Sequence, residues 1–229
     1  MKRFSVAIDG PAGAGKSTLA KAAAARLGFV YVDTGAIYRT VGLAARNAGV
    51  DKADSEGIKA LLTSLQVDIR YENGVQKMYL NGGDVTGEIR SPEISAYASY
   101  VSAIPEVRAF LMEMQRRLAR EHDVIMDGRD IGTVVLPEAG LKIFLTASAE
   151  KRAMRRFREL QEKNPAITFE EVLSDMTARD AKDSQRETAP LKAAEDAVLV
   201  DTSDLGLEES VELIVNMIAR QRETTEAQE

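Results

Sequence analysis

The sequence predicts an α/β protein with a five-stranded parallel sheet that is covered by helices on both faces. Short apolar runs of strand length alternate along the chain with longer helical patterns, as in folds whose sheet is buried between helices. The first run leads through a glycine-rich turn into an alanine-rich helix, which begins a β-α-β unit. We expect the strands at residues 4–8, 29–32, 124–126, 141–145 and 198–200.

Capping residues and apolar spacing predict the helices. A helix over residues 16–27 should end at Gly28, because glycine tolerates the left-handed backbone past a helix end. Asp54 or Ser55 should cap a helix that reaches residue 65. Further helices are predicted at residues 36–48, 105–121 and 208–220, and the polar residues 222–229 are expected to fray.

The helix over residues 105–121 shows apolar residues at the spacing of one buried face. Arg108 lies off that stripe, and the methionines of this helix are interpreted as core filler. The stripe consists of Val107, Phe110, Leu111, Met114 and Leu118.

Residues 65–102 interrupt the alternation of strands and helices. Two alternating runs, at 67–71 and 76–80, flank Asn73-Gly74, and this pattern is a strong signal for a β-hairpin. Ser91-Pro92 then has the residue types of a helix cap and first helical position. We therefore predict that a small antiparallel subdomain is inserted here.

Residues 10–17 match the phosphate-binding motif G-x-x-x-x-G-K-[ST], between an apolar run and a helix. Glycines let backbone N–H groups approach phosphate oxygens, and the helix adds the positive end of its dipole. Lys16 would contact the β and γ phosphates, and the Ser17 hydroxyl would bind Mg²⁺. Either Asp9 or Asp127 could hold the water shell of that ion. The residues predicted to bind the phosphate donor are Gly10, Pro11, Ala12, Gly13, Ala14, Gly15, Lys16, Ser17 and Thr18.

Two further polar stretches follow strands and should lie at the same edge of the sheet as the glycine-rich loop. Residues 33–39 supply a carboxylate, a hydroxyl, an aromatic ring and a guanidinium, and residues 127–133 supply a second arginine between two aspartates. In open parallel sheets ligands bind at the carboxyl ends of the strands. Both stretches are therefore candidate parts of the site.

Nearly half of residues 150–187 are charged, nine basic and nine acidic. Lys163 is one of the basic residues. Most of these charges fit two solvated helices, the second capped by the box that begins at Thr168. The remaining arginines fit a mobile lid that brings positive charge to a transferring phosphoryl group. The domain 1–229 is thus divided into a core of about 1–64, 103–149 and 188–229, an insert of about 65–102 and a lid of about 150–187.

Composition limits the possible functions. The chain has no cysteine and one histidine, His122, so zinc, disulfide and histidine-dependent nucleophile chemistry are unsupported. A net charge of −6 argues against a nucleic acid polymer as partner. No apolar run has the length of a membrane span or a secretory signal, so we expect a cytoplasmic protein without a membrane partner, and we expect it to be a monomer.

Together these motifs resemble those of bacterial cytidylate kinases, over essentially the whole chain. The resemblance rests on residues 8–17, 33–39 and 127–133 and on the stretch from Arg179 to Arg186. It implies transfer of the γ-phosphoryl group of ATP to CMP or dCMP with Mg²⁺. It also implies acceptor-phosphate clamps at Arg39 and Arg129, pentose contacts at Thr34, Arg179 and Asp183, and cytosine contacts at Ser99, Arg108, Asp130 and Arg186, with Tyr38 also in the substrate-binding set. Lys16, Arg129, Arg179 and Arg186 are the predicted catalytic residues.

The chemistry of the residues agrees with this resemblance. The second pKa of a nucleoside monophosphate is near 6, so the attacking oxygen is already ionised at pH 7 and needs no general base. The protein then has only to position and neutralise the phosphates. Two alternatives stay open: another small-molecule kinase of this loop type, with an alcohol acceptor, and a noncatalytic ATP-sensing module.

Overall fold

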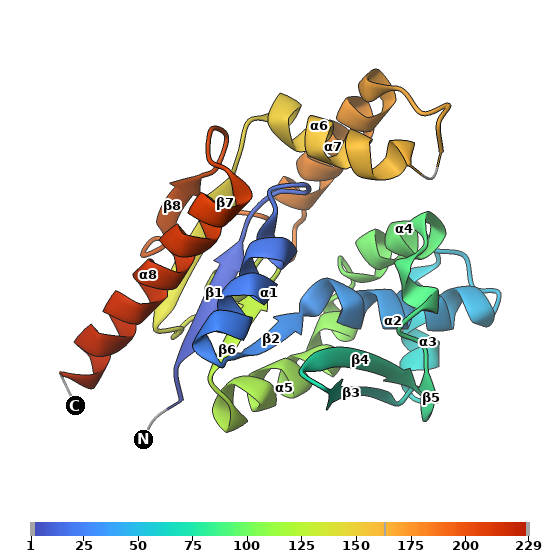
Figure 1. The fold of residues 1–229 in the computed structure, drawn as a ribbon. Coiled ribbons are helices and arrows are strands. Elements are labelled where there is room, and N and C mark those ends of the chain that lie inside the picture. Colours follow the sequence, from blue (N-terminus) through green and yellow to red (C-terminus); the bar gives the residue numbers. More distant parts are fainter. Residues whose placement is uncertain (1–2, 163, 228–229) are drawn as a thin grey trace. The chain divides into compact units, whose positions relative to one another are not determined.

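The computed structural model describes residues 3–162 and 164–227. Its main element is a five-stranded parallel sheet with the strand order β2-β6-β1-β7-β8, which confirms the predicted sheet (Figure 1). The strands are β1 (Ser5–Asp9), β2 (Val30–Asp33), β6 (Val124–Asp127), β7 (Leu141–Thr146) and β8 (Val198–Asp201).

Most strands of this sheet end on an aspartate. Asp9, Asp33, Asp127 and Asp201 each form the last residue of a strand, one position beyond the predicted end. The ladder includes them, since Ile8 is in register with Asp127 and Asp9 with Phe144. Apolar patterning cannot predict this extension, because it follows side chains whereas the ladder depends on backbone groups.

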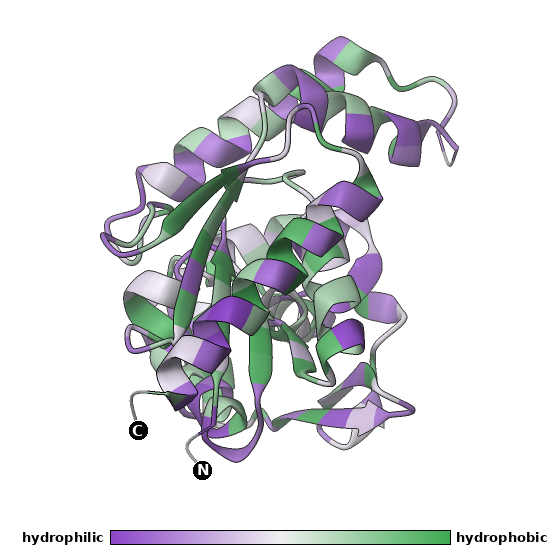
Figure 2. Cartoon of the chain, turned by 60° about the vertical axis from the view of Figure 1, so that its left-hand side comes forward, coloured by the Kyte–Doolittle hydropathy of each residue, from purple (hydrophilic) through white to green (hydrophobic). Residues whose placement is uncertain are grey.

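The described residues form two compact units, 3–31 with 121–227 and 32–120, and the chain passes between them within β2. The helices of the first unit are α1 (Lys16–Leu27), α6 (Ala149–Gln161), α7 (Phe169–Ser184) and α8 (Leu207–Glu226), with a short π-helical turn η2 (Ile131–Val135). Buried apolar side chains join the strands, which are hydrophobic along most of their length in Figure 2, to α1 and α8. Among them are Ile8, Leu19, Ile125, Ile143 and Ile214.

The second unit contains the predicted hairpin. Strands β3 (Val67–Glu72) and β4 (Val75–Leu80) are antiparallel, and Asn73 and Gly74 turn with φ of 51° and 75°. The unpredicted β5 (Gly83–Asp84) pairs with β4. The helices of this unit are α2 (Thr34–Asn47), α3 (Ser55–Leu62), the 3₁₀ turn η1 (Glu88–Arg90), α4 (Pro92–Val101) and α5 (Pro105–Glu121, whose last residue belongs to the first unit).

Local capping explains where several of these helices begin. Asp54 caps α3 by accepting from the Gly57 N–H at 2.9 Å, and Ser91 caps α4 through the Ile94 N–H. Asp33 caps α2 through the Ala36 N–H at 2.8 Å, so α2 begins two residues before the predicted position. The end predicted for the helix after Asp54 was wrong, since α3 stops at Leu62.

The prediction that Phe110 lies on the buried face of α5 was wrong. Phe110 of α5 is 36% exposed, whereas Arg108 and Gln115 are buried, because the buried face runs through Val107, Leu111 and Leu118. The side-chain nitrogen of the buried Gln115 donates to the Leu111 carbonyl at 3.2 Å, whereas its Oε1 atom has no partner among the described residues.

The carboxyl end of α8 was also predicted wrongly. The helix continues to Glu226, where Arg222 pairs with Glu226 at 2.9 Å and lies 5.4 Å from the centre of the Phe29 ring. The Thr225 hydroxyl donates to the carbonyl of Gln221, so this polar segment satisfies its own groups as a helix. Of the tail predicted to fray, residues 228 and 229 lie outside the described part of the chain. In the described part, none of the helices combines the length and the apolar character that crossing a lipid bilayer requires.

Candidate active site

The glycine-rich loop between β1 and α1 adopts a conformation that only glycine accepts readily. Gly10, Gly13 and Gly15 have φ of 147°, 71° and 87°. A Cβ atom on Gly10 would lie 2.0 Å from the Leu145 carbonyl oxygen, so β7 passes directly against the loop. Since Gly15 has no side chain to cap α1, the first-turn N–H groups of that helix are suited to an anionic ligand.

Lys16 is buried at the start of α1. Its Nζ atom donates to the Pro11 carbonyl at 2.7 Å, which ties the two ends of the loop together. Burial lowers the pKa of the Lys16 ammonium well below its usual value, and repulsion from Arg129 and Arg179 lowers it further, whereas Asp127 and Asp9 oppose the change. Lys16 is therefore exposed to the charges of both arginines and aspartates at the start of α1.

The two aspartates proposed for the Mg²⁺ water shell differ in their partners. Asp127 accepts from the Ser17 hydroxyl at 2.7 Å and from the Tyr31 hydroxyl at 3.1 Å. Asp9 instead uses its two oxygens to accept from the backbone N–H groups of Ile131 and Gly132, at 2.8 and 2.7 Å. Burial raises the pKa of Asp9 to about 6, although these hydrogen bonds favour its charged form. Asp9 thus anchors η2, and Asp127 lies beside Ser17.

In the second unit, Asp33 organises several polar groups. One of its oxygens accepts from Arg39 Nη2 at 2.9 Å and from Arg90 Nη1 at 3.1 Å, and Gln76 bonds to both backbone groups of Asp33. The Nε atom of Arg39 is buried and has no partner among the residues that the structure describes, which suits a ligand oxygen. Sequence reasoning missed Arg90 and Gln76, which lie in the insert at positions without a motif.

The other predicted residues of the second unit lie near α2 and α4. Thr34 and Tyr38 are buried on α2, and the Arg108 guanidinium is 5.8 Å from the centre of the Tyr38 ring. Arg108 also donates to the Ser102 carbonyl at 3.3 Å, and the Ser102 hydroxyl donates to the Ser99 carbonyl. The structure therefore groups Tyr38, Ser99 and Arg108 within this unit.

In the first unit, Asp183 joins two of the predicted arginines. Arg129 Nε donates to one Asp183 oxygen at 2.9 Å, and Arg186 Nη2 lies 3.9 Å from the other. Asp183 is buried, so the pair is held in a defined geometry rather than solvated. Asp130 is also buried, and its backbone carbonyl accepts from the N–H groups of Val134 and Val135 in η2. Arg179 is exposed on α7.

The charged segment 150–187 forms the two predicted helices α6 and α7, and its contacts with the rest of the first unit are more extensive than those of a solvated hairpin. The capping box is confirmed, since Thr168 and Glu171 exchange side-chain to backbone bonds at 3.2 and 2.9 Å. Arg156 pairs with Glu159 in solvent, whereas Arg155 donates to the Thr202 carbonyl at 2.7 Å. The predicted lid residue Lys163 lies outside the described residues.

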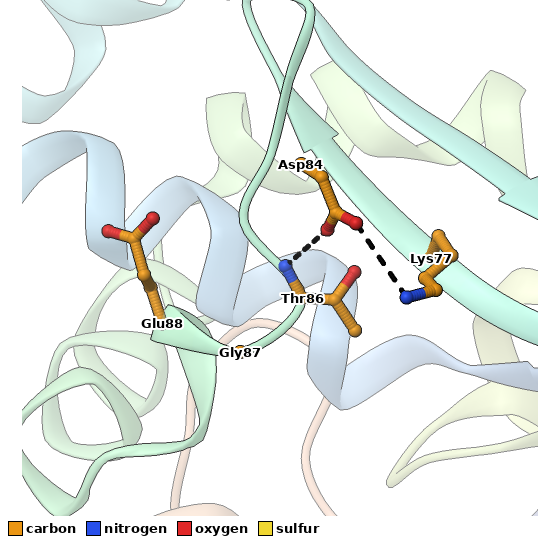
Figure 3. Close-up of a pocket in the computed structure, with 5 residues that line it drawn as sticks. All are labelled: Lys77, Asp84, Thr86, Gly87 and Glu88. Atoms are coloured by element: carbon orange, nitrogen blue, oxygen red, sulfur yellow. Dashed lines mark hydrogen bonds and ion pairs between the residues drawn. The ribbon is translucent and has the colours of Figure 1, made fainter.

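A separate pocket of about 660 Å³ lies in the second unit (Figure 3). It is lined by Lys77, Asp84, Thr86, Gly87 and Glu88. Asp84 accepts from the Thr86 N–H at 2.8 Å and lies 3.7 Å from Lys77, so its charge is matched locally. The predicted site residues do not line this pocket.

Comparisons with known proteins identify the family of the chain. A family model described as cytidylate kinase matches residues 6–220. The chain is 49% identical over 217 residues to the cytidylate kinase of Caldicellulosiruptor bescii, covering 95% of this chain and 96% of that protein. It is 50% identical over 214 residues to the cytidylate kinase of Thermosipho melanesiensis, covering 93% and 95%.

A solved structure supports the fold alone. The chain is similar to an uncharacterized protein from Eubacterium ventriosum, with a TM-score of 0.53 and 11% sequence identity over 95% of this chain and 99% of that one. The sequence matches extend over the glycine-rich loop, the strand-end aspartates and the arginines around Asp183. The chain therefore belongs to the cytidylate kinase family.

Proposed function

We propose that the protein transfers the γ-phosphoryl group of ATP to CMP and dCMP, giving CDP and dCDP. The observation that carries this proposal is the glycine-rich loop, whose left-handed glycines and uncapped helix start leave backbone N–H groups for a ligand. Backbone donors of this kind, with Lys16 beside them, suit a ligand that carries several phosphate groups. A nucleoside triphosphate has the required charge and shape, and membership of the cytidylate kinase family indicates the acceptor.

The proposed roles follow the chemistry of each residue. Residues 10–18 bind the phosphates of ATP, and Lys16, Arg129, Arg179 and Arg186 neutralise the charge that develops during transfer. Arg39 and Arg129 bind the acceptor phosphate, and Thr34, Arg179 and Asp183 bind the pentose. Ser99, Arg108, Asp130 and Arg186 bind cytosine, with Tyr38 beside Arg108. No general base is needed, because the acceptor phosphate is already ionised at pH 7. The cytoplasmic location and the monomeric state stay predictions.

The residues beside the loop fit Mg²⁺. This ion prefers oxygen ligands and is usually bound by one or two protein groups together with substrate phosphates and waters. The Ser17 hydroxyl and the Asp127 carboxylate supply such oxygens 2.7 Å apart, and we assign the water shell to Asp127 because backbone N–H groups occupy both oxygens of Asp9. When bound, the ion would neutralise phosphate charge that Ser17 and Lys16 approach from the protein side.

We expect Ser17→Ala and Asp127→Asn to raise the Mg²⁺ concentration needed for half-maximal activity by about tenfold, since each removes one oxygen contact or one charge. Titration of activity with MgCl₂ at saturating ATP measures this shift. Asp9→Asn is the matched control and should leave the Mg²⁺ dependence unchanged. If the required Mg²⁺ concentration rises in Asp9→Asn but not in Asp127→Asn, Asp9 rather than Asp127 supports the water shell of the ion.

A coupled assay for ADP release with a panel of acceptors tests the function as a whole. We expect rapid ADP release with CMP and dCMP, and slow release with UMP, AMP, shikimate or gluconate. Preference for an alcohol acceptor would indicate a different small-molecule kinase, and ATP binding without turnover on the whole panel would indicate a noncatalytic module.

A further inference from the structure

Ala12, in the middle of the glycine-rich loop, is bound by two helices that lie far from it in the sequence. Its backbone N–H donates to Asp180 Oδ1 of α7 at 3.0 Å, and its carbonyl accepts from Arg152 Nη1 of α6 at 2.8 Å. Its methyl group packs against the apolar cluster of Ala153, Val172 and Met176 between these helices. Both polar groups of this residue and its side chain are therefore held by the α6–α7 hairpin.

Arg152 and Asp180 also bind each other, which closes a ring of contacts. Arg152 Nη1 lies 2.5 Å from Asp180 Oδ2, and Arg152 Nε donates to the Ala147 carbonyl at 2.9 Å. Arg152 is 8% exposed as a residue, so its charge is removed from water and depends on these partners. A buried pair of this kind contributes little net stability but allows very few alternative geometries.

The loop needs such an external constraint. Gly10, Gly13 and Gly15 have many backbone conformations in the unfolded chain, and a loop of this kind has no strand ladder to fix it. The hairpin approaches closely at Gly13 as well, where a Cβ atom would lie 2.5 Å from Met176 Cε and 3.2 Å from the Arg152 carbonyl oxygen. The sheet thus fixes the loop at Gly10, and α6 and α7 fix it at Ala12 and Gly13.

We propose that Arg152 and Asp180 are positioning residues that hold the loop backbone at Ala12 in the shape that binds the triphosphate. This inference rests on the proposed binding of ATP by residues 10–18. The two side chains do not contact the nucleotide in this account. They act through Ala12, so that the N–H groups of the loop stay directed toward the phosphates. The same contacts keep α7 docked, and with it the neighbouring Arg179.

The experiment measures ATP binding by calorimetry in the absence of acceptor, for wild type, Asp180→Ala, Arg152→Met and the double variant. Each single variant should raise the Kd for ATP by about tenfold or more, the effect of one charge-assisted hydrogen bond. Since the two residues act as one unit, the Kd of the double variant should not exceed the higher of the two single-variant Kd values. Matched controls are Asp175→Ala on α7 and Arg156→Met on α6, which are exposed and should bind ATP as the wild type does.

Several outcomes would overturn the proposal. A purely structural role predicts a lower melting temperature with an unchanged Kd in the folded variants. If the two residues act independently, the fold-increase in Kd of the double variant should equal the product of the fold-increases of the single variants. If Asp180→Ala does not fold, Asp180→Asn serves, because its amide oxygen can still accept from the Ala12 N–H. Its Kd should stay below that of Arg152→Met, and an equal or higher Kd would refute the role of the Ala12 bond. Failure of wild type to bind ATP would instead refute the proposed function.

Discussion

Replacing Lys16 with alanine should lower kcat by about 10²- to 10³-fold while the protein remains folded. Loss of one preorganised cation or donor at a transferring phosphoryl group has an effect of this size. The buried side chain bonds through its Nζ atom to the Pro11 carbonyl. Removing it also relieves the burial of a charged group and its repulsion by Arg129 and Arg179, which together lower its pKa, so we expect only a small loss of stability.

Steady-state kinetics with CMP and a thermal melt measure the two halves of this prediction. Lys21→Ala, an exposed lysine on the same helix, is the control and should behave as wild type. Lys16→Met keeps most of the side-chain volume and should be as inactive as Lys16→Ala. Wild-type turnover by a folded Lys16→Ala protein would show that the loop does not bind the transferred phosphate as proposed.

Replacing Asp130 with alanine should remove most of the preference for CMP over UMP. Cytosine presents an amino donor and the N3 acceptor, which suit a carboxylate and an arginine such as Arg108 or Arg186. Uracil reverses both groups, so its carbonyl would face the carboxylate and its N3–H would face an arginine. Sites that depend on such hydrogen bonds can discriminate by about 10⁴-fold. Burial of Asp130 excludes water that could otherwise compensate for a wrong base.

The ratio of kcat/KM for CMP and UMP, measured in wild type and in Asp130→Ala, tests this prediction. We expect a ratio of about 10⁴ in wild type, and a loss of at least 10²-fold in the variant, mostly through slower use of CMP. Glu138→Ala, an exposed carboxylate on the same segment, should leave the ratio unchanged. Unchanged selectivity in Asp130→Ala would exclude Asp130 from the base contacts.

Local rules predicted much of the fold because each rule depends on neighbouring residues. Gly28 ends α1 with φ of 71°, Asn73-Gly74 forms the hairpin turn, and Thr168 begins α7 as a capping box. The predicted glycine-rich loop has the left-handed glycines that its motif requires. In each case one residue type suits the backbone conformation or cap required at that position, and the neighbouring few residues of the sequence indicate that requirement.

The remaining features depend on contacts between segments far apart in the sequence. Asp33 and Arg90 are 57 positions apart, and Ala12 and Asp180 are 168 positions apart, so no local pattern connects them. Phe110 has the apolar character of a core residue, yet the packing around α5 leaves it exposed. Our proposal of Asp127 rather than Asp9 for the Mg²⁺ water shell also depends on the structure, because both residues end a buried strand and differ in their hydrogen bonds.

The bond between the Lys16 ammonium and the Pro11 carbonyl has a kinetic consequence. Fixing one residue of a flexible backbone costs about 1–2 kcal/mol of conformational entropy. Because Lys16 already binds the Pro11 carbonyl in the folded protein, the loop is ordered during folding and not on nucleotide binding. An arriving nucleotide then exchanges one oxygen partner of the ammonium for another, without having to order the loop. Association should therefore proceed at a rate set by diffusion and long-range attraction, with no slow rearrangement of the chain before capture.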